Sequence, residues 1–220
     1  MEKTNKIKKF TVLGILFLLP ITVYLFFASG VNNFGKLPIL TEAVSDIENF
    51  TSLDSSSVQL ENHITVLGFF GNDVESKKAN AFNLAHKIYK KYYQFKDFQF
   101  VIVIDENQRE EALQLKEKLK EIEDPKNWKF VYADEADVKK VFYSLKSNYS
   151  LDDNMSSPYV FIIDHDNNLR GRDENEDSEK LYGFDARNYS EINNKMDDDI
   201  KVIIAEYRLA LKKYNSNREI

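Results

Sequence analysis

Hydrophobic positions along the chain form two alternating patterns, short and mostly apolar runs and longer stripes spaced three or four residues apart. The short runs, rich in β-branched and aromatic residues, predict buried strands at residues 64–70, 98–104, 129–133 and 159–163, with a hairpin partner at 169–172. The stripes predict helices at 82–92, 112–122, 138–145 and from Ser190, the expected N-cap, to 211. The resulting order, β-α-β-α-β-α-β-β-α, calls for a central mixed sheet with helices on both faces.

This order is that of a thioredoxin-like α/β domain with one additional helix. Mixed and polar sequence, including Gly35, Pro38 and a run of three serines, fills residues 29–57 and predicts a tether followed by a short lead-in strand. We therefore expect the folded domain over residues 58–214, followed by a C-terminal tail over 215–220.

An apolar run, Phe10–Phe27, precedes the tether. Its eighteen residues would cover about 27 Å as a helix, close to the thickness of about 30 Å of a hydrocarbon layer, and predict a transmembrane anchor over residues 10–28. Four lysines within residues 1–9, with no charge directly after the run, predict a cytoplasmic N-terminus and a domain outside the cytoplasm, in the periplasm if the cell is Gram-negative. The alternative is a cleaved signal peptide, because Ala28-Ser29-Gly30 offers small residues to a peptidase.

Composition excludes several classes of function. The chain has no cysteine, which removes thiol nucleophiles, disulfide exchange and thiolate metal sites. From Lys36 onward, 26 basic residues stand against 35 acidic ones, a net charge near −9. Because nucleic acids are bound through basic residues that displace counterions, we expect no nucleic-acid partner. The expected partners are the membrane and a protein at its surface, and no small-molecule substrate is expected.

Four short stretches of the chain match corresponding places in one known family. They are Phe69-Phe70 at the end of the first strand, Asp124-Pro125-Lys126-Asn127-Trp128 before the third strand, Ser157-Pro158-Tyr159-Val160-Phe161-Ile162-Ile163-Asp164 around the penultimate strand, and Leu169-Arg170-Gly171 in the hairpin. Over residues 58–213 the chain thereby resembles the Sco/SenC family, membrane-anchored thioredoxin-fold proteins that deliver copper to cytochrome oxidase. The resemblance implies a thioredoxin-like fold and a cis peptide bond at Pro158.

The copper ligands of that family are absent from this chain. In the family, copper is held by a Cys-x-x-x-Cys pair after the first strand and by a histidine shortly before the Ser-Pro step. The cysteine positions are Asp73 and Lys77 or, shifted by one residue, Val74 and Lys78, and the histidine position is Ser156. We therefore expect a divergent member without redox or family-type copper chemistry, without a cofactor and without catalytic residues, that serves as a binding or assembly module.

The alternative function is a copper chaperone for cytochrome oxidase assembly that uses ligands other than cysteine. Its metal candidates are Met155, beside the lost histidine position, and His86 on the first helix of the domain. The other two histidines, His63 and His165, begin a strand and occupy a turn. We expect the three histidines to lie apart, without a shared metal site.

The first candidate interaction surface is the loop after the first strand. Its candidate residues are Asp73 and Glu75. Carboxylates at the start of a helix are also favoured by capping and by the helix dipole, so a structural role accounts for them equally well.

The second candidate interaction surface is the acidic loop over residues 173–179. Its candidate residues are Asp173, Glu174 and Asp177, with Tyr182 nearby. Exposed aromatic side chains can anchor a protein partner. The alternative is that Tyr182, Phe184 and Tyr189 cover the base of the last helix.

Overall fold

A computed structural model describes the backbone of residues 2–28, 36–173 and 180–216, together with the side chains of Lys8, 12–24, 36–173 and 180–212. The chain divides into two compact units, Met1–Gly35 and Lys36–Ile220.

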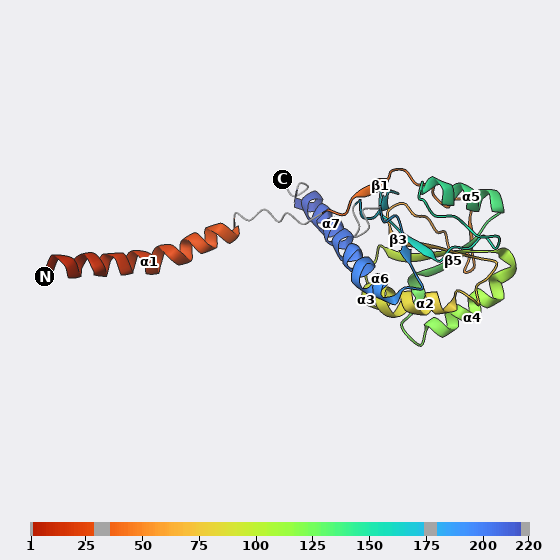
Figure 1. Cartoon of the computed structure of the whole chain (residues 1–220), viewed down its shortest axis with the longest axis horizontal. Helices are drawn as coiled ribbons and strands as arrows, with labels where there is room; N and C mark the ends of the chain where they lie inside the picture. Colours follow the sequence, from red (N-terminus) through yellow and green to blue (C-terminus); the bar gives the residue numbers. More distant parts are fainter. Residues whose placement is uncertain (1, 29–35, 174–179, 217–220) are drawn as a thin grey trace. The chain divides into compact units, whose positions relative to one another are not determined.

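The first unit contains the helix α1, Glu2–Ala28, which covers the predicted apolar run and includes Pro20 (Figure 1). Over the described residues, no helix combines the length and the apolar character that crossing a membrane requires. The transmembrane anchor therefore stays a prediction.

The second unit is built on one mixed sheet with the strand order β1-β7-β6-β3-β4-β5-β2, and β8 also pairs with β6. The strands are β1 Ile39–Thr41, β2 Thr51–Ser52, β3 Ile64–Gly71, β4 Phe98–Ile104, β5 Trp128–Tyr132, β6 Tyr159–Ile163, β7 Leu169–Arg170 and β8 Phe184–Asp185. The three central strands β3, β4 and β5 are parallel, and β6 runs antiparallel beside β3. The loops after the parallel strands therefore meet at one edge of the sheet.

Helices cover both faces of this sheet (Figure 1). They are α2 Lys78–Leu84, η1 Ala85–Tyr89, α3 Lys90–Tyr92, η2 Glu106–Gln108, α4 Arg109–Leu119, η3 Pro125–Asn127, α5 Glu135–Ser144, α6 Tyr189–Glu191, η4 Ile192–Met196 and α7 Asp197–Ser216. The apolar stripes of α2, η1, α4 and α7 pack into one core, and α5 packs into the core of the opposite face. Two of the short segments, η1 and η4, are π-helical turns within longer helices.

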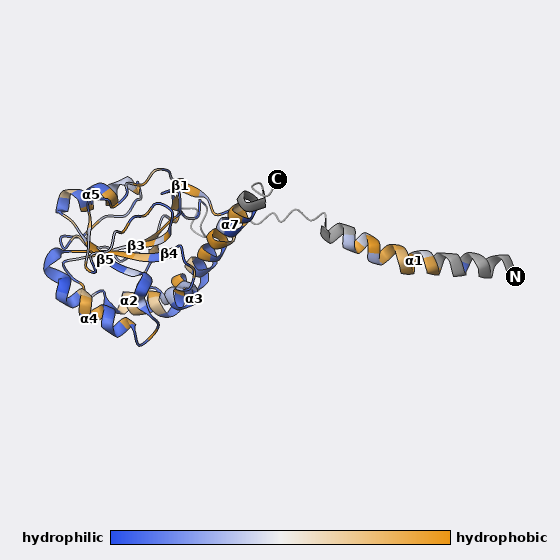
Figure 2. Cartoon of the chain, turned by 180° about the vertical axis from the view of Figure 1, so that it is seen from behind, coloured by the Kyte–Doolittle hydropathy of each residue, from blue (hydrophilic) through white to orange (hydrophobic). Residues whose placement is uncertain are grey.

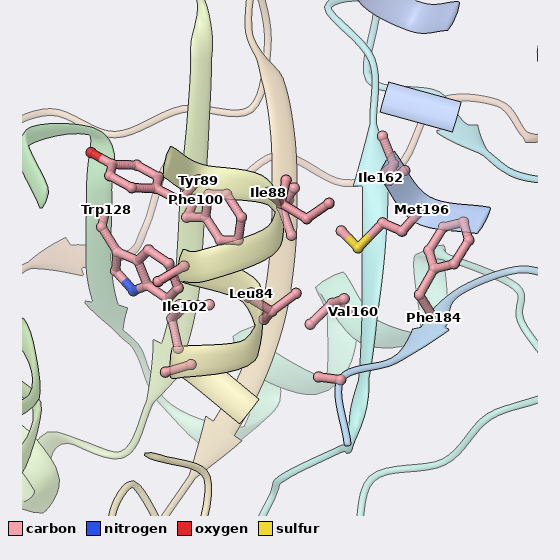
Figure 3. Close-up of a cluster of buried hydrophobic side chains, with 14 of the residues drawn as sticks. Leu84, Ile88, Tyr89, Phe100, Ile102, Trp128, Val160, Ile162, Phe184 and Met196 are labelled. Atoms are coloured by element: carbon pink, nitrogen blue, oxygen red, sulfur yellow. The ribbon is translucent and has the colours of Figure 1, made fainter. Parts of the chain in front are cut away.

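An aromatic cluster lies in the core that is covered by α2, η1, α4 and α7 (Figure 3). The rings of Phe100 and Trp128 stack at 4.4 Å, and the ring of Tyr89 meets both edge-on at 5.6 and 5.5 Å. The Tyr89 hydroxyl donates to the Asp124 carbonyl at 2.7 Å and accepts from the Asn127 N–H at 3.0 Å. Burial raises the pKa of Tyr89 to about 12, so the hydroxyl stays protonated. The Asp-Pro-Lys-Asn-Trp stretch thus ties the turn before β5 to the core.

The predicted order of the main strands and helices is confirmed, and the differences concern short elements. Residues 36–57, expected to form a tether and lead-in strand, supply two edge strands, β1 and β2, and bury Val44 and Ile47. The strand β8 was not predicted. Ser190 is not the N-cap of the last helix, because Asn188 caps it by accepting from the N–H groups of Ser190 and Glu191.

A buried arginine joins three distant parts of the second unit. The Arg170 guanidinium donates to Asp164 Oδ2 at 3.1 Å, to Glu206 Oε2 at 2.7 Å and, through Nε, to the Leu37 carbonyl at 3.0 Å. Glu206 Oε1 in turn accepts from the Leu37 N–H at 2.9 Å. This Arg170 clamp fixes the start of the folded unit to β7 and α7.

Replacing Arg170 by methionine should destabilise the second unit by about 3–5 kcal/mol, because the buried Asp164 carboxylate loses its partner. The control is Arg187→Met, which removes a pair between Asp185 and an exposed arginine and should cost at most about 1 kcal/mol. Urea unfolding of residues 36–220 measures both free energies. Equal losses in the two variants would contradict the structural role of the Arg170 clamp.

Candidate functional site

The carboxyl ends of the parallel strands β3, β4 and β5 lie at one edge of the sheet, which we call the carboxyl edge. The residues that correspond to the copper ligands of the Sco/SenC family lie at this edge. The loop after β3, the ends of β4 and β5, and the loop before β6 meet there. Ligand sites in α/β sheets are commonly built at this edge. The side chains at these positions therefore decide which chemistry the edge can perform.

Backbone hydrogen bonds join the loop after β3 to the loop before β6. The Asn72 N–H donates to the Asn154 carbonyl at 2.8 Å, and the Ser157 N–H donates to the Phe69 carbonyl at 2.9 Å. Gly71 lies between these bonds with φ +54°, and a Cβ atom there would come within 1.9 Å of the Asn154 carbonyl oxygen. Only glycine allows the two loops to approach this closely.

Ser156, at the lost histidine position, is buried and bound to its own loop. Its hydroxyl donates to Asp152 Oδ2 at 2.8 Å, and its N–H donates to Asp152 Oδ1 at 2.8 Å. Partial burial raises the pKa of Asp152, but the hydrogen bonds from Ser156 and Asn154 outweigh burial and leave the pKa below its usual value. The Asp152 carboxylate therefore holds the loop before β6 in place.

The cysteine positions of the family hold no ligand set in either register. The Asp73 carboxylate accepts from the Ser76 hydroxyl, and Val74 is buried in the core. Glu75 is exposed, and its hydrogen bond from Lys78 Nζ at 2.8 Å lowers the pKa of Glu75. The capping interpretation of Asp73 and Glu75 is wrong, because the N-cap of α2 is Lys77 and no side chain caps it.

A small pocket of about 70 Å³ opens beside the contact between the loop after β3 and the loop before β6. It is lined by Gly71, Val103, Ile104, Asp105, Ala133, Glu135, Val138 and Met155. Two carboxylates contribute to it, but Asp105 also caps η2 through the Asn107 N–H and Glu135 pairs with Lys139. Small-molecule pockets usually have volumes of about 300–1,000 Å³, so this pocket is too small for most small-molecule ligands.

The metal candidates are not gathered into a site. Met155 lines the pocket in a left-handed conformation, with φ +55°, whereas His86 is exposed on η1. His63 and His165 lie in turns at the opposite edge of the sheet, where the Asn62 N–H donates to the His165 carbonyl at 2.9 Å. In the part of the chain that the structure describes, no three of histidine, cysteine, aspartate and glutamate could hold a metal ion together. The residues present do not fit the copper site of the family.

The aromatic residues near the acidic loop are mostly covered. Phe184 is fully buried, and Tyr182 is half-buried against the core on the α5 side of the sheet. Tyr189 is 50% exposed, and Lys87 Nζ lies 4.3 Å from its ring centre. Asp173 is exposed, and Glu174 and Asp177 lie outside the described residues.

The predicted cis bond before β6 is wrong. Across the described residues no peptide bond is cis. The Ser157–Pro158 bond is trans, and its two residues are held by backbone hydrogen bonds: the Ala186 N–H donates to the Pro158 carbonyl at 2.9 Å, and the Ser157 N–H donates to the Phe69 carbonyl. The trans form is also favoured by about 0.5–1 kcal/mol for X-Pro bonds.

The comparisons with known proteins agree with this architecture. No protein-family profile and no curated protein matches the sequence. Similar solved structures include a putative electron transfer protein from Aquifex aeolicus VF5, with TM-score 0.52 and 14% identity over 74% of this chain and 97% of that one. They also include BsSco, described as a member of the Sco family of cytochrome c oxidase assembly proteins, with TM-score 0.51 and 12% identity over 76% of this chain and 97% of that one. The chain has a thioredoxin-like fold. It shares this fold with Sco proteins, and it has no cysteine.

Replacing Gly71 by alanine should destabilise the second unit by about 2–4 kcal/mol, through left-handed backbone strain and overpacking against Asn154. The control is Asn72→Ala at the neighbouring exposed position, which keeps the backbone bond and should change stability by at most about 0.5 kcal/mol. Urea unfolding measures both variants. A tolerated Gly71→Ala substitution would show that the two loops are not tightly joined.

Proposed function

We propose that the protein is a membrane-anchored, extracytoplasmic binding or assembly module on a Sco-like scaffold, and that it is not an enzyme. The observation that carries this proposal is the set of side-chain contacts at the carboxyl edge. Asp73 and Ser156, at the family's ligand positions, are each bound to a neighbouring residue of their own loop, and the pocket beside them has a volume of only about 70 Å³.

The side chains of this edge have structural partners. The Ser156 hydroxyl binds Asp152, Asp73 binds Ser76, and Glu75 pairs with Lys78. A catalytic acid and base need environments that push their pKa values apart. Here the shifts of Asp152 and Glu75 are both downward, which keeps the two carboxylates ionised. Surface recognition is the function that such an edge supports best.

The partner that best fits the pocket is a protein. The lining combines the apolar side chains of Val103, Val138 and Met155 with carboxylates at Asp105 and Glu135. A short apolar side chain of a partner could enter, and a flanking lysine or arginine could face the carboxylates. The apolar sequence of 10–27 and the lysines before it support placement of the module on the outer face of a membrane.

A photo-reactive amino acid at Asn72 should crosslink the full chain to a discrete protein partner in intact membranes. The same group at Gln59, which is exposed near the opposite edge, should not capture it. In the Asn72-labelled chain, Ala133→Glu should reduce the adduct at least tenfold because it fills the pocket, whereas Ala136→Glu on the exposed face of α5 should preserve it.

The adduct pattern decides whether the carboxyl edge binds a partner. Circular dichroism must show that both glutamate variants remain folded. No discrete adduct from Asn72, or equal capture from Gln59, would refute binding at this edge.

A further inference from the structure

Charge is unevenly distributed along the last helix. The first turn of α7 contains Asp197, Asp198 and Asp199. Its second half contains Arg208, Lys212 and Lys213, with no acidic residue between Glu206 and Glu219. The helix dipole favours this order, so charge order alone indicates no ligand.

Exposed leucines on the same half of α7 require another explanation. Ile200, Ile203 and Ile204 are buried in the core, whereas Leu209 and Leu211 are 42% and 43% exposed. The hydrophobic colouring of α7 continues into this half (Figure 2). Arg208 and Lys212 are four residues apart and share one side of the helix, and Leu209 and Leu211 lie on either side of them. Basic and apolar side chains together allow a helix to bind at a lipid interface.

The chain enters the folded unit beside this half of α7. Glu206 accepts from the Leu37 N–H at 2.9 Å, and the Arg170 clamp binds both Glu206 and the Leu37 carbonyl. Eight residues, 29–36, separate Leu37 from the last residue of α1 in the sequence. An extended chain covers about 3.5 Å per residue, so a bilayer anchor would hold Leu37 within about 30 Å of the membrane.

A second basic group lies against the same helix. The ring of Phe95 packs edge-on against Tyr207 at 5.8 Å, and the Arg208 guanidinium lies 5.3 Å from the Phe95 ring centre. The turn that carries Phe95 also carries the exposed Lys96. Basic residues from two elements thus gather at one end of a domain whose overall charge is strongly negative.

We propose that the second half of α7 is a lipid-binding surface that docks the domain on an anionic bilayer. Arg208, Lys212 and Lys96 face the lipid phosphates. Leu209 and Leu211, one on either side of Arg208 and Lys212 around the helix, contact the interface at the borders of this surface. The direction of the docking follows from the charges, because an anionic surface attracts the basic end and repels the acidic remainder of the domain. This inference rests on the proposed membrane anchor for its biological setting, but the lipid contact can be measured without α1.

The test is cosedimentation of residues 36–220, a compact unit with its own core, with vesicles. Vesicles of phosphatidylglycerol and phosphatidylcholine in equal parts should bind the domain, and vesicles of phosphatidylcholine alone should not. Each basic residue near an anionic surface contributes about a fivefold factor in affinity, so Arg208→Gln with Lys212→Gln should weaken binding about 25-fold. Leu209→Ser with Leu211→Ser should weaken it at least tenfold.

Matched controls lie on α4 and at its C-cap, Lys120: Lys118→Gln with Lys120→Gln removes two exposed charges, and Leu113→Ser removes an exposed leucine. Both controls should stay within twofold of the parent. Equal binding to the two vesicle types, or an equal loss in the α4 variants, would overturn the proposal. A lipid-independent dimer that Leu209→Ser with Leu211→Ser abolishes would also overturn it, since the leucines would then contact a second copy.

Separate experiments test the proposed function and the lipid-binding surface of α7. Release of the full chain from membranes by alkaline carbonate would refute the anchor without affecting vesicle binding by residues 36–220. Loss of the Asn72 adduct would refute binding at the carboxyl edge and leave the α7 surface unchanged.

Discussion

The close approach of Gly71 to the Asn154–Met155 backbone constrains the whole carboxyl edge of the sheet. Because position 71 has no side chain, the loop after β3 comes near enough for the 2.8 Å bond from the Asn72 N–H to the Asn154 carbonyl. That bond, with the one from Ser157 to Phe69, starts the pairing of β6 beside β3. Met155, next to Asn154, adopts a left-handed conformation and lines the pocket. Two backbone hydrogen bonds therefore hold the loop after β3 and the loop before β6 together at this edge.

The Arg170 clamp fixes the point at which the chain enters the second unit. A buried ion pair contributes little to stability by itself, because desolvation offsets the attraction between the charges. The ion pair does determine the position of Leu37, because Glu206 accepts from the Leu37 N–H and Arg170 donates to the Leu37 carbonyl. The clamp places the start of the folded unit beside the basic half of α7. The carboxyl edge and the point at which the chain enters the folded unit thus lie on different surfaces of the second unit.

The sequence was sufficient to predict the long elements but not the contacts between loops. The strands β3, β4 and β6 are mostly apolar runs, and their pattern is a local property. The strands β1, β2 and β8 have two or three residues each, so tertiary pairing forms them and no local pattern does. The pairing of Gly71 with Asn154 joins residues 83 positions apart, which no motif in one sequence reveals. Asp152 and Ser156 did offer a signal, because an aspartate commonly binds N–H groups a few residues later.

Copper binding by the purified domain distinguishes a recognition module from a chaperone most directly. Residues 36–220 are mixed with Cu(I) held by a competing chromogenic chelator, and the loss of the chelator's absorbance reports transfer. Asp73 and Ser156, at the family's ligand positions, are bound to neighbours in their own loops, so we expect no transfer, and no difference between the parent domain and Met155→Leu. Stoichiometric Cu(I) retained at submicromolar affinity, and lost in Met155→Leu or His86→Ala, would contradict the recognition module and establish a copper site.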